Sequence, residues 1–151
     1  MRIPKKKSKF IEGVFHPMYK DKYKGSFPII YRSSWELGMF RFLDRSSACV
    51  SWGSESTVVQ YFFQGKAHRY FIDLTATMKT KDGIKKFLIE IKPYRQTIPP
   101  VPSPKKSKKT VITENFNYEK NMAKWQAARE YARVKGCEFI IFTEKDIGID
   151  K

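Results

Sequence analysis

Residues 85–95 place a carboxylate and an ammonium group two positions apart in an otherwise apolar segment. Successive side chains of a strand point to opposite faces, so Glu90 and Lys92 emerge side by side while Ile89 and Ile91 point away from them. A carboxylate that holds a divalent metal, next to an ammonium that steadies an anion, supplies the groups for metal-assisted phosphodiester hydrolysis. Acidic and basic residues also alternate on the wet face of many antiparallel strands, so the rest of the chain must decide between these interpretations.

The elements that must position this pair can be predicted from the spacing of apolar residues. A serine that can cap a helix precedes an apolar set at helical spacing near residue 35, and a longer helical stripe ends at Gly136. The predicted helices cover residues 32–44 and 117–135, and the predicted strands cover residues 58–63, 70–77, 87–92 and 137–142. This order, α-β-β-β-α-β, predicts an α/β fold in which helices cover a central mixed sheet.

A second carboxylate is expected close to the first. A turn at residues 81–83 makes the strands 70–77 and 87–92 partners in a hairpin, which brings Asp73 within reach of Glu90. Apolar residues flank Asp73, so an unmatched carboxylate there would lose its hydration without compensation, whereas a bound cation removes that cost. An aspartate at the end of a strand that is simply hydrated is the alternative.

The order of the acidic residues resembles the PD-(D/E)xK nuclease superfamily. In that superfamily a glutamate on a helix, an aspartate on a strand and the glutamate of Glu-x-Lys ligate one or two Mg²⁺ ions, and the lysine orients or activates the attacking water. The resemblance implies a restriction-endonuclease-like core in which Mn²⁺ can substitute for Mg²⁺. It implies catalytic roles for Glu36, Asp73, Glu90 and Lys92, and metal ligation by Glu36, Asp73, Glu90 and the backbone carbonyl of Ile91. The first of these glutamates also lies where a helix dipole favours any carboxylate.

The flanking residues carry a closer resemblance, which covers residues 30–145. They are similar to the endonuclease subunit of heteromeric bacterial transposases and, even more, to the head completion nucleases of large tailed bacteriophages. This implies an Mg²⁺-dependent endonuclease or end-processing nuclease that cuts DNA without regard to sequence, works in the host cytoplasm during phage assembly or in the virion, and meets phage head or neck proteins. The matching segments are Arg-Ser-Ser-Trp-Glu at 32–36, Tyr-Phe-Ile-Asp at 70–73, Glu-Ile-Lys-Pro at 90–93, Lys-Trp-Gln-Ala-Ala at 124–128 and Phe-Ile-Ile-Phe-Thr-Glu at 139–144.

The composition predicts a polyanionic partner. The 151 residues include 30 Lys and Arg against 15 Asp and Glu, which gives a formal charge of +15. Aromatic residues make up 15% of the chain, so the positive charge belongs to a domain with a core rather than to a disordered tail. No apolar run approaches the length of a membrane span, and we expect no membrane partner.

The basic residues cluster in segments that are typical of extensions from a domain. We expect residues 1–28 to form a basic extended arm lying on the domain or on a partner, and residues 29–151 to form the nuclease domain, with a Pro/Lys-rich excursion at residues 97–114. None of the basic segments offers an ordered recognition helix with Asn, Gln or Arg placed to read base edges, so we expect DNA to be recognised by shape or by its ends. The candidate DNA-binding residues are Lys5, Lys6, Lys7, Lys9, Lys105, Lys106, Lys108 and Lys109.

Two other classes of function remain open on these grounds. A structural head or neck protein could keep the nuclease fold and bind the packaged DNA end without turnover. A basic RNA-binding protein would show no dependence on a divalent metal and no role for Glu90. The intact set of acidic residues and lysine favours the nuclease, because a retired site has no reason to keep a buried pair of carboxylates.

Overall fold

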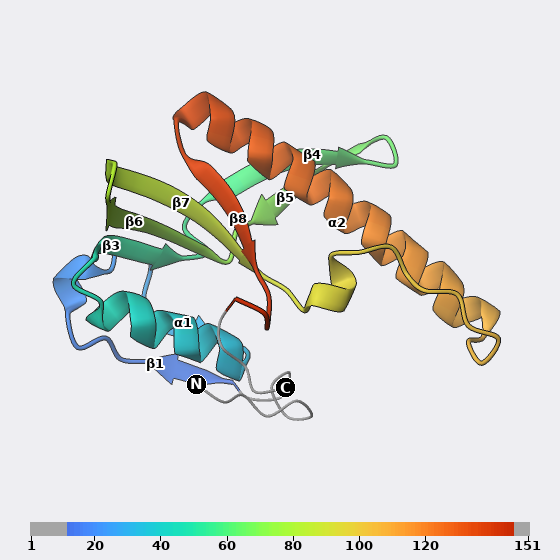
Figure 1. Cartoon of the computed structure of the whole chain (residues 1–151), viewed down its shortest axis with the longest axis horizontal. Helices are drawn as coiled ribbons and strands as arrows, with labels where there is room; N and C mark the ends of the chain where they lie inside the picture. Colours follow the sequence, from blue (N-terminus) through green and yellow to red (C-terminus); the bar gives the residue numbers. More distant parts are fainter. Residues whose placement is uncertain (1–11, 147–151) are drawn as a thin grey trace.

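Short strands and two long helices make up the fold, which a computed structural model describes for residues 12–146 (Figure 1). None of the helices described is long and apolar enough to cross a membrane. The elements are β1 (Gly13–Phe15), η2 (Lys20–Lys22), β2 (Ile29–Tyr31), α1 (Ser34–Arg45), β3 (Cys49–Ser54), β4 (Val58–Phe63), β5 (Lys66–Phe71), β6 (Leu74–Thr80), β7 (Gly83–Ile91), η3 (Tyr94–Gln96), α2 (Lys108–Lys135) and β8 (Glu138–Phe142).

A four-stranded mixed sheet, in the order β3-β6-β7-β8, forms the centre of the domain. The first three strands pair antiparallel, and β8 joins β7 in parallel after the chain has crossed over through α2. Figure 1 shows α1 on one side of this sheet and α2 on the other. The prediction of a central mixed sheet flanked by helices is therefore confirmed.

Each face of the sheet has its own apolar core, because successive residues of β7 point to opposite sides. Ile89 belongs to the cluster that includes Phe40 and Leu43 of α1, whereas Leu88 belongs to the cluster of Trp125 and Ala128 of α2. The helix ends follow their predicted signals. The Ser33 hydroxyl accepts the N–H of Glu36 at the start of α1, and Gly136 closes α2 with a left-handed φ of 71°.

The segment predicted as an arm contributes to the domain from residue 12 onward. β1 pairs with β2 to form a small hairpin, and Phe15 and Tyr23 are buried in the cluster on the α1 side. The fully buried Asp44 carboxylate accepts the N–H groups of Met18 and Tyr19 and so ties this segment to the end of α1. The lysines predicted to bind DNA at positions 5–9 lie outside the described residues.

The predicted strand 70–77 is wrong as a single element. β5 ends at Phe71 and pairs with β4 in a separate hairpin, whereas β6 begins at Leu74 in the central sheet. The chain passes between the two sheets at Ile72 and Asp73, where the buried Ile72 side chain continues the alternation of apolar residues and hides the break from the sequence pattern. The strand β3 was also missed.

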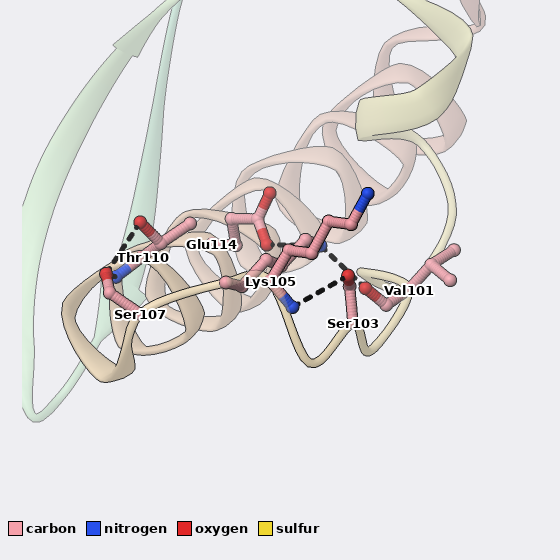
Figure 2. A network of polar contacts seen from close by, with 7 residues as sticks. Val101, Ser103, Lys105, Ser107, Thr110 and Glu114 are labelled. Atoms are coloured by element: carbon pink, nitrogen blue, oxygen red, sulfur yellow. Dashed lines mark hydrogen bonds and ion pairs between the residues drawn. The ribbon is translucent and has the colours of Figure 1, made fainter.

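The excursion predicted at residues 97–114 is correct only for its first part. α2 begins at Lys108 rather than at Asn117, because Ser107 caps it by accepting the N–H of Thr110 at 3.1 Å. The Lys106 ammonium group ties the preceding loop to the helix, because it bonds to the Val101 carbonyl at 2.6 Å and to Glu114 at 2.8 Å. Figure 2 shows Val101 in this loop, Glu114 on the helix, and Ser107 beside Thr110 at the helix start. Residues 108–114 are therefore helical.

Candidate active site

The two predicted carboxylates come together where β6 and β7 run side by side. Leu74 pairs with Ile89 in the antiparallel register, so Asp73, just before β6, lies beside the end of β7 that carries Glu90. The Asp73 Oδ2 atom accepts the backbone N–H of Ile91 at 2.8 Å, which fixes its orientation. The sequence pattern predicted this convergence through the hairpin, although it assigned Asp73 to the interior of a strand.

Glu90 is held by partners from three directions. Only 3% of the residue is exposed. Its Oε1 accepts the Tyr70 hydroxyl at 2.8 Å, and its Oε2 accepts the Trp125 indole N–H at 3.3 Å. The Lys92 ammonium lies 3.5 Å from the same Oε2. These contacts keep a buried carboxylate in one position and satisfy its oxygen atoms.

Glu36 approaches the pair from the first turn of α1. Its Oε1 accepts the backbone N–H of Arg32, the residue before the Ser33 cap, at 2.8 Å, so the side chain folds back over the start of the helix. Burial raises the pKa of Glu36, and the charges of Glu55 and Glu90 add to this rise, while Arg32 opposes it. Glu36 therefore belongs electrostatically to the site, although its carboxylate accepts its hydrogen bond from the backbone of Arg32.

The negative charge of the site is incompletely compensated. Burial raises the pKa of Asp73 well above its usual range, and the neighbouring charges of Glu90 and Glu36 raise it further, while the hydrogen bond from Ile91 lowers it. A divalent cation would relieve this repulsion, and carboxylate oxygens are ligands that Mg²⁺ prefers. The donor types therefore fit such an ion.

The arrangement does not enclose a cation by itself. Within residues 12–146, no three acidic, histidine or cysteine side chains are grouped closely enough to hold a metal ion. Mg²⁺ commonly binds through one or two carboxylates and completes its shell with water and substrate phosphate, so Asp73 and Glu90 would suffice as its protein anchors. Ile91 contacts Asp73 through its N–H, and metal ligation by its carbonyl stays a prediction.

Sequence reasoning missed three residues of the site. Tyr70 and Trp125 lie in segments that carry the resemblance but were given no role, yet both donate hydrogen bonds to Glu90. Lys124 lies with its ammonium 5.3 Å from the Tyr70 ring centroid, and burial lowers its pKa while the Glu90 charge opposes that shift. The signal that could have revealed Tyr70 and Trp125 is an aromatic residue with an O–H or N–H group at a position predicted to be buried. Such a buried donor needs an acceptor.

The predicted DNA-binding lysines of the excursion differ in their surroundings. Lys105, Lys108 and Lys109 are exposed around the start of α2. Lys106 is half-buried, and its ammonium is engaged by Val101 and Glu114. The contacts of Lys106 within the fold therefore explain its position. The ammonium groups of the three exposed lysines can contact a partner.

A pH dependence of stability follows from the raised pKa values of Asp73 and Glu36. Both carboxyl groups hold a proton more tightly in the folded chain than in the unfolded one. Their contribution to the free energy of unfolding is fully present below the ordinary carboxyl pKa of about 4 and is lost as the pH rises through the raised values. We expect the metal-free protein to lose thermal stability over that interval. A thermal unfolding series in a chelator would check this, and a slope equally steep in Asp73→Asn would contradict the assignment.

Comparison with known proteins agrees with this architecture. A mixed sheet between two helices, with a carboxylate before one central strand and a Glu-x-Lys sequence at the end of its neighbour, is typical of restriction-endonuclease-like enzymes. The family model described as TnsA-like endonuclease N terminal matches residues 46–144, and the chain belongs to this family. It is also 39% identical over 138 residues to the head completion nuclease of Enterobacteria phage T4, a match that covers 87% of this chain and 90% of that protein. The predicted resemblance, fold class and nuclease function are confirmed.

Proposed function

We propose that the chain is an Mg²⁺-dependent DNA endonuclease or end-processing nuclease that acts in the completion of a phage head. One observation carries the chemistry: Asp73 and Glu90 converge from neighbouring strands, with the Lys92 ammonium 3.5 Å from Glu90. The name of the T4 relative supports the place of this reaction in head completion. Work at that stage would bring the protein, inside the host cell, into contact with head or neck proteins.

Each residue of the site has a separate role in the proposed reaction. Asp73 and Glu90 would hold the cation, which supplies polarisation of the scissile phosphate and activation of the attacking water. Lys92 would stabilise the negative charge that develops on the phosphate oxygens. Tyr70 and Trp125 hold the Glu90 carboxylate in one orientation, because each donates a hydrogen bond to one of its oxygen atoms. The products would carry 5′-phosphate and 3′-hydroxyl ends.

A polar cleft beside Glu36 offers room for the DNA backbone. It has a volume of about 560 Å³, and the charged residues of its lining are Lys24, Arg32 and Glu55. The Arg32 guanidinium is paired with Glu55 at 2.7 Å, and its backbone N–H bonds to the Glu36 carboxylate. Among the proposed metal ligands, Glu36 is joined to this lining by its hydrogen bond from Arg32.

The test of this proposal is cleavage of supercoiled and linear DNA by the purified chain. We expect nicking or trimming with Mg²⁺ or Mn²⁺, none in a chelator, and a loss of about 10²- to 10³-fold in rate for Lys92→Ala. DNA binding by Lys92→Ala, followed in parallel, separates a catalytic defect from a defect in affinity. If the wild type binds DNA but never cleaves it with either metal, the nuclease proposal fails and the structural head protein becomes the better account.

The lysines near the start of α2 should differ in their effect on DNA affinity. Replacing Lys105 or Lys109 by Gln should weaken binding and reduce the slope of log K against log salt by about 0.9 for each phosphate that is no longer neutralised. Lys106→Gln is the matched control, because its ammonium is already bound to Val101 and Glu114. Titrations at several salt concentrations measure this. An equal slope change in all three variants would mean that Lys106 leaves its loop to meet DNA.

A further inference from the structure

The β4–β5 hairpin is a second part of the molecule whose exposed residues are of the types that bind nucleic acid. Its strands pair from Val58↔Phe71 to Phe63↔Lys66, and a tight turn at Gln64 and Gly65, with φ values of 51° and 74°, joins them. Figure 1 shows the hairpin alongside α2, with its turn projecting from the sheet. Residues 58–71 contain no aspartate and no glutamate.

One face of the hairpin is firmly anchored. Val59, Tyr61 and Tyr70 are each 3% exposed and pack in the cluster that contains Trp125. At the turn, the Phe63 ring meets Phe116 of α2 edge to face, with ring centroids 5.2 Å apart. These contacts hold the hairpin in a fixed position, so its opposite face has a fixed orientation.

The outward face combines aromatic rings with positive charge. Phe62 is 70% exposed and Phe71 is 46% exposed, although alternation could have placed polar residues there. The Arg69 guanidinium lies 5.5 Å from the Phe71 ring centroid. Arg69 forms no ion pair with any residue between 12 and 146. Rings that stack and cations that meet phosphates are the two components of surfaces that bind unpaired nucleic acid.

The Phe71 end of the hairpin lies next to the candidate active site. Phe71 precedes Asp73 by two residues, and the neighbouring Tyr70 donates its hydroxyl to Glu90. Phe62 pairs with Ala67, which is about 13 Å along the strand from Phe71 at the usual rise per residue. That distance corresponds to about four base pairs of B-form DNA. A DNA strand cut at the carboxylates can therefore run along the hairpin to Phe62.

We propose that the outer face of the β4–β5 hairpin binds DNA next to the cleavage point, with Phe62 stacking on an unpaired base at an end, gap or branch. Arg69, on the same face, contacts an adjoining phosphate. This inference rests on the proposed function and specifies its substrate as DNA with unpaired bases beside the cut. DNA is favoured over a protein partner by the absence of aspartate and glutamate from residues 58–71 and by the position of Phe71, two residues before Asp73.

Binding by a cleavage-deficient chain tests the hairpin separately from catalysis. In an Asp73→Asn background, fluorescence anisotropy would compare a blunt duplex with the same duplex carrying a single-stranded overhang. We expect preference for the overhang, and Phe62→Ala should weaken overhang binding by about 5- to 150-fold and remove the preference. Phe62→Trp should restore it. Phe42→Ala, at a residue of α1 that is 54% exposed, is the matched control and should change nothing.

The possible outcomes distinguish the two proposals. If Phe62→Ala binds the overhang as tightly as its parent while the wild-type chain cleaves DNA, the hairpin inference is overturned and the nuclease stands. If the wild-type chain cleaves no DNA with Mg²⁺ or Mn²⁺, the proposed function fails whatever the hairpin does. If Phe62→Ala reduces self-association in sedimentation without changing DNA affinity, the face joins two copies of this chain, which also overturns the inference.

Discussion

Asp73→Asn should abolish DNA cleavage and at the same time make the metal-free protein more stable. The amide oxygen of asparagine can still accept the Ile91 N–H, so the local geometry is kept. The substitution removes a carboxyl group whose charge is repelled by Glu90 and Glu36. We expect the cleavage rate to fall by about 10²- to 10³-fold, because the variant lacks one anchor of the cation and its charge.

Cleavage assays and thermal unfolding, measured in parallel, test whether Asp73→Asn lowers the cleavage rate while it raises the stability of the metal-free protein. Thermal unfolding in a chelator should give a higher midpoint for Asp73→Asn than for the wild type, whereas added Mg²⁺ should raise the midpoint of the wild type alone. Asp82→Asn makes the same chemical change in the exposed turn before β7 and should alter neither property. A lower midpoint for Asp73→Asn in the chelator would show that the carboxylate stabilises the metal-free fold.

Trp125→Ala should cause a large loss of stability. The side chain is 1% exposed and fills the core between α2 and the sheet, and truncations of this size cost about 3–5 kcal/mol. The change also removes the indole N–H from the buried Glu90 carboxylate. Domains of this size unfold with about 5–15 kcal/mol, so this variant should lose a large share of its stability and its cleavage activity.

Trp125→Phe separates the two contributions. It keeps most of the apolar volume but lacks the N–H, so it should cost about 1–3 kcal/mol for the donor that Glu90 loses. Gln126→Ala changes the exposed neighbour in the same turn and should stay within about 0.5 kcal/mol of the wild type. Urea unfolding of the three variants measures these differences. Equal stability of Trp125→Phe and the wild type would mean that the hydrogen bond contributes nothing.

The parts of the site that obey local rules were predictable from sequence. Ser33 predicts the start of α1 because its hydroxyl can cap a helix. This start places Glu36 in the first turn of the helix. Alternation along β7 placed Glu90 and Lys92 on one face, and the turn before β7 brought Asp73 to Glu90. These inferences needed only the period of a strand and the connection between two adjacent strands.

The parts that depend on tertiary packing were not predictable. The break between β5 and β6 follows from the choice of different partner strands, which the continuous alternation around Ile72 conceals. The first two turns of α2 contain Val111 and Ile112 as exposed residues, so no apolar stripe marks them. The bond from Trp125 to Glu90 joins residues that only the docking of α2 brings together.

The parallel pairing of β8 with β7 has a consequence for the order in which the chain folds. β6 and β7 are joined by a two-residue turn and can pair early, whereas β8 and Trp125 arrive only after the connection through residues 92–137 has closed. Asp73 and Glu90 would therefore meet before the indole donor reaches them.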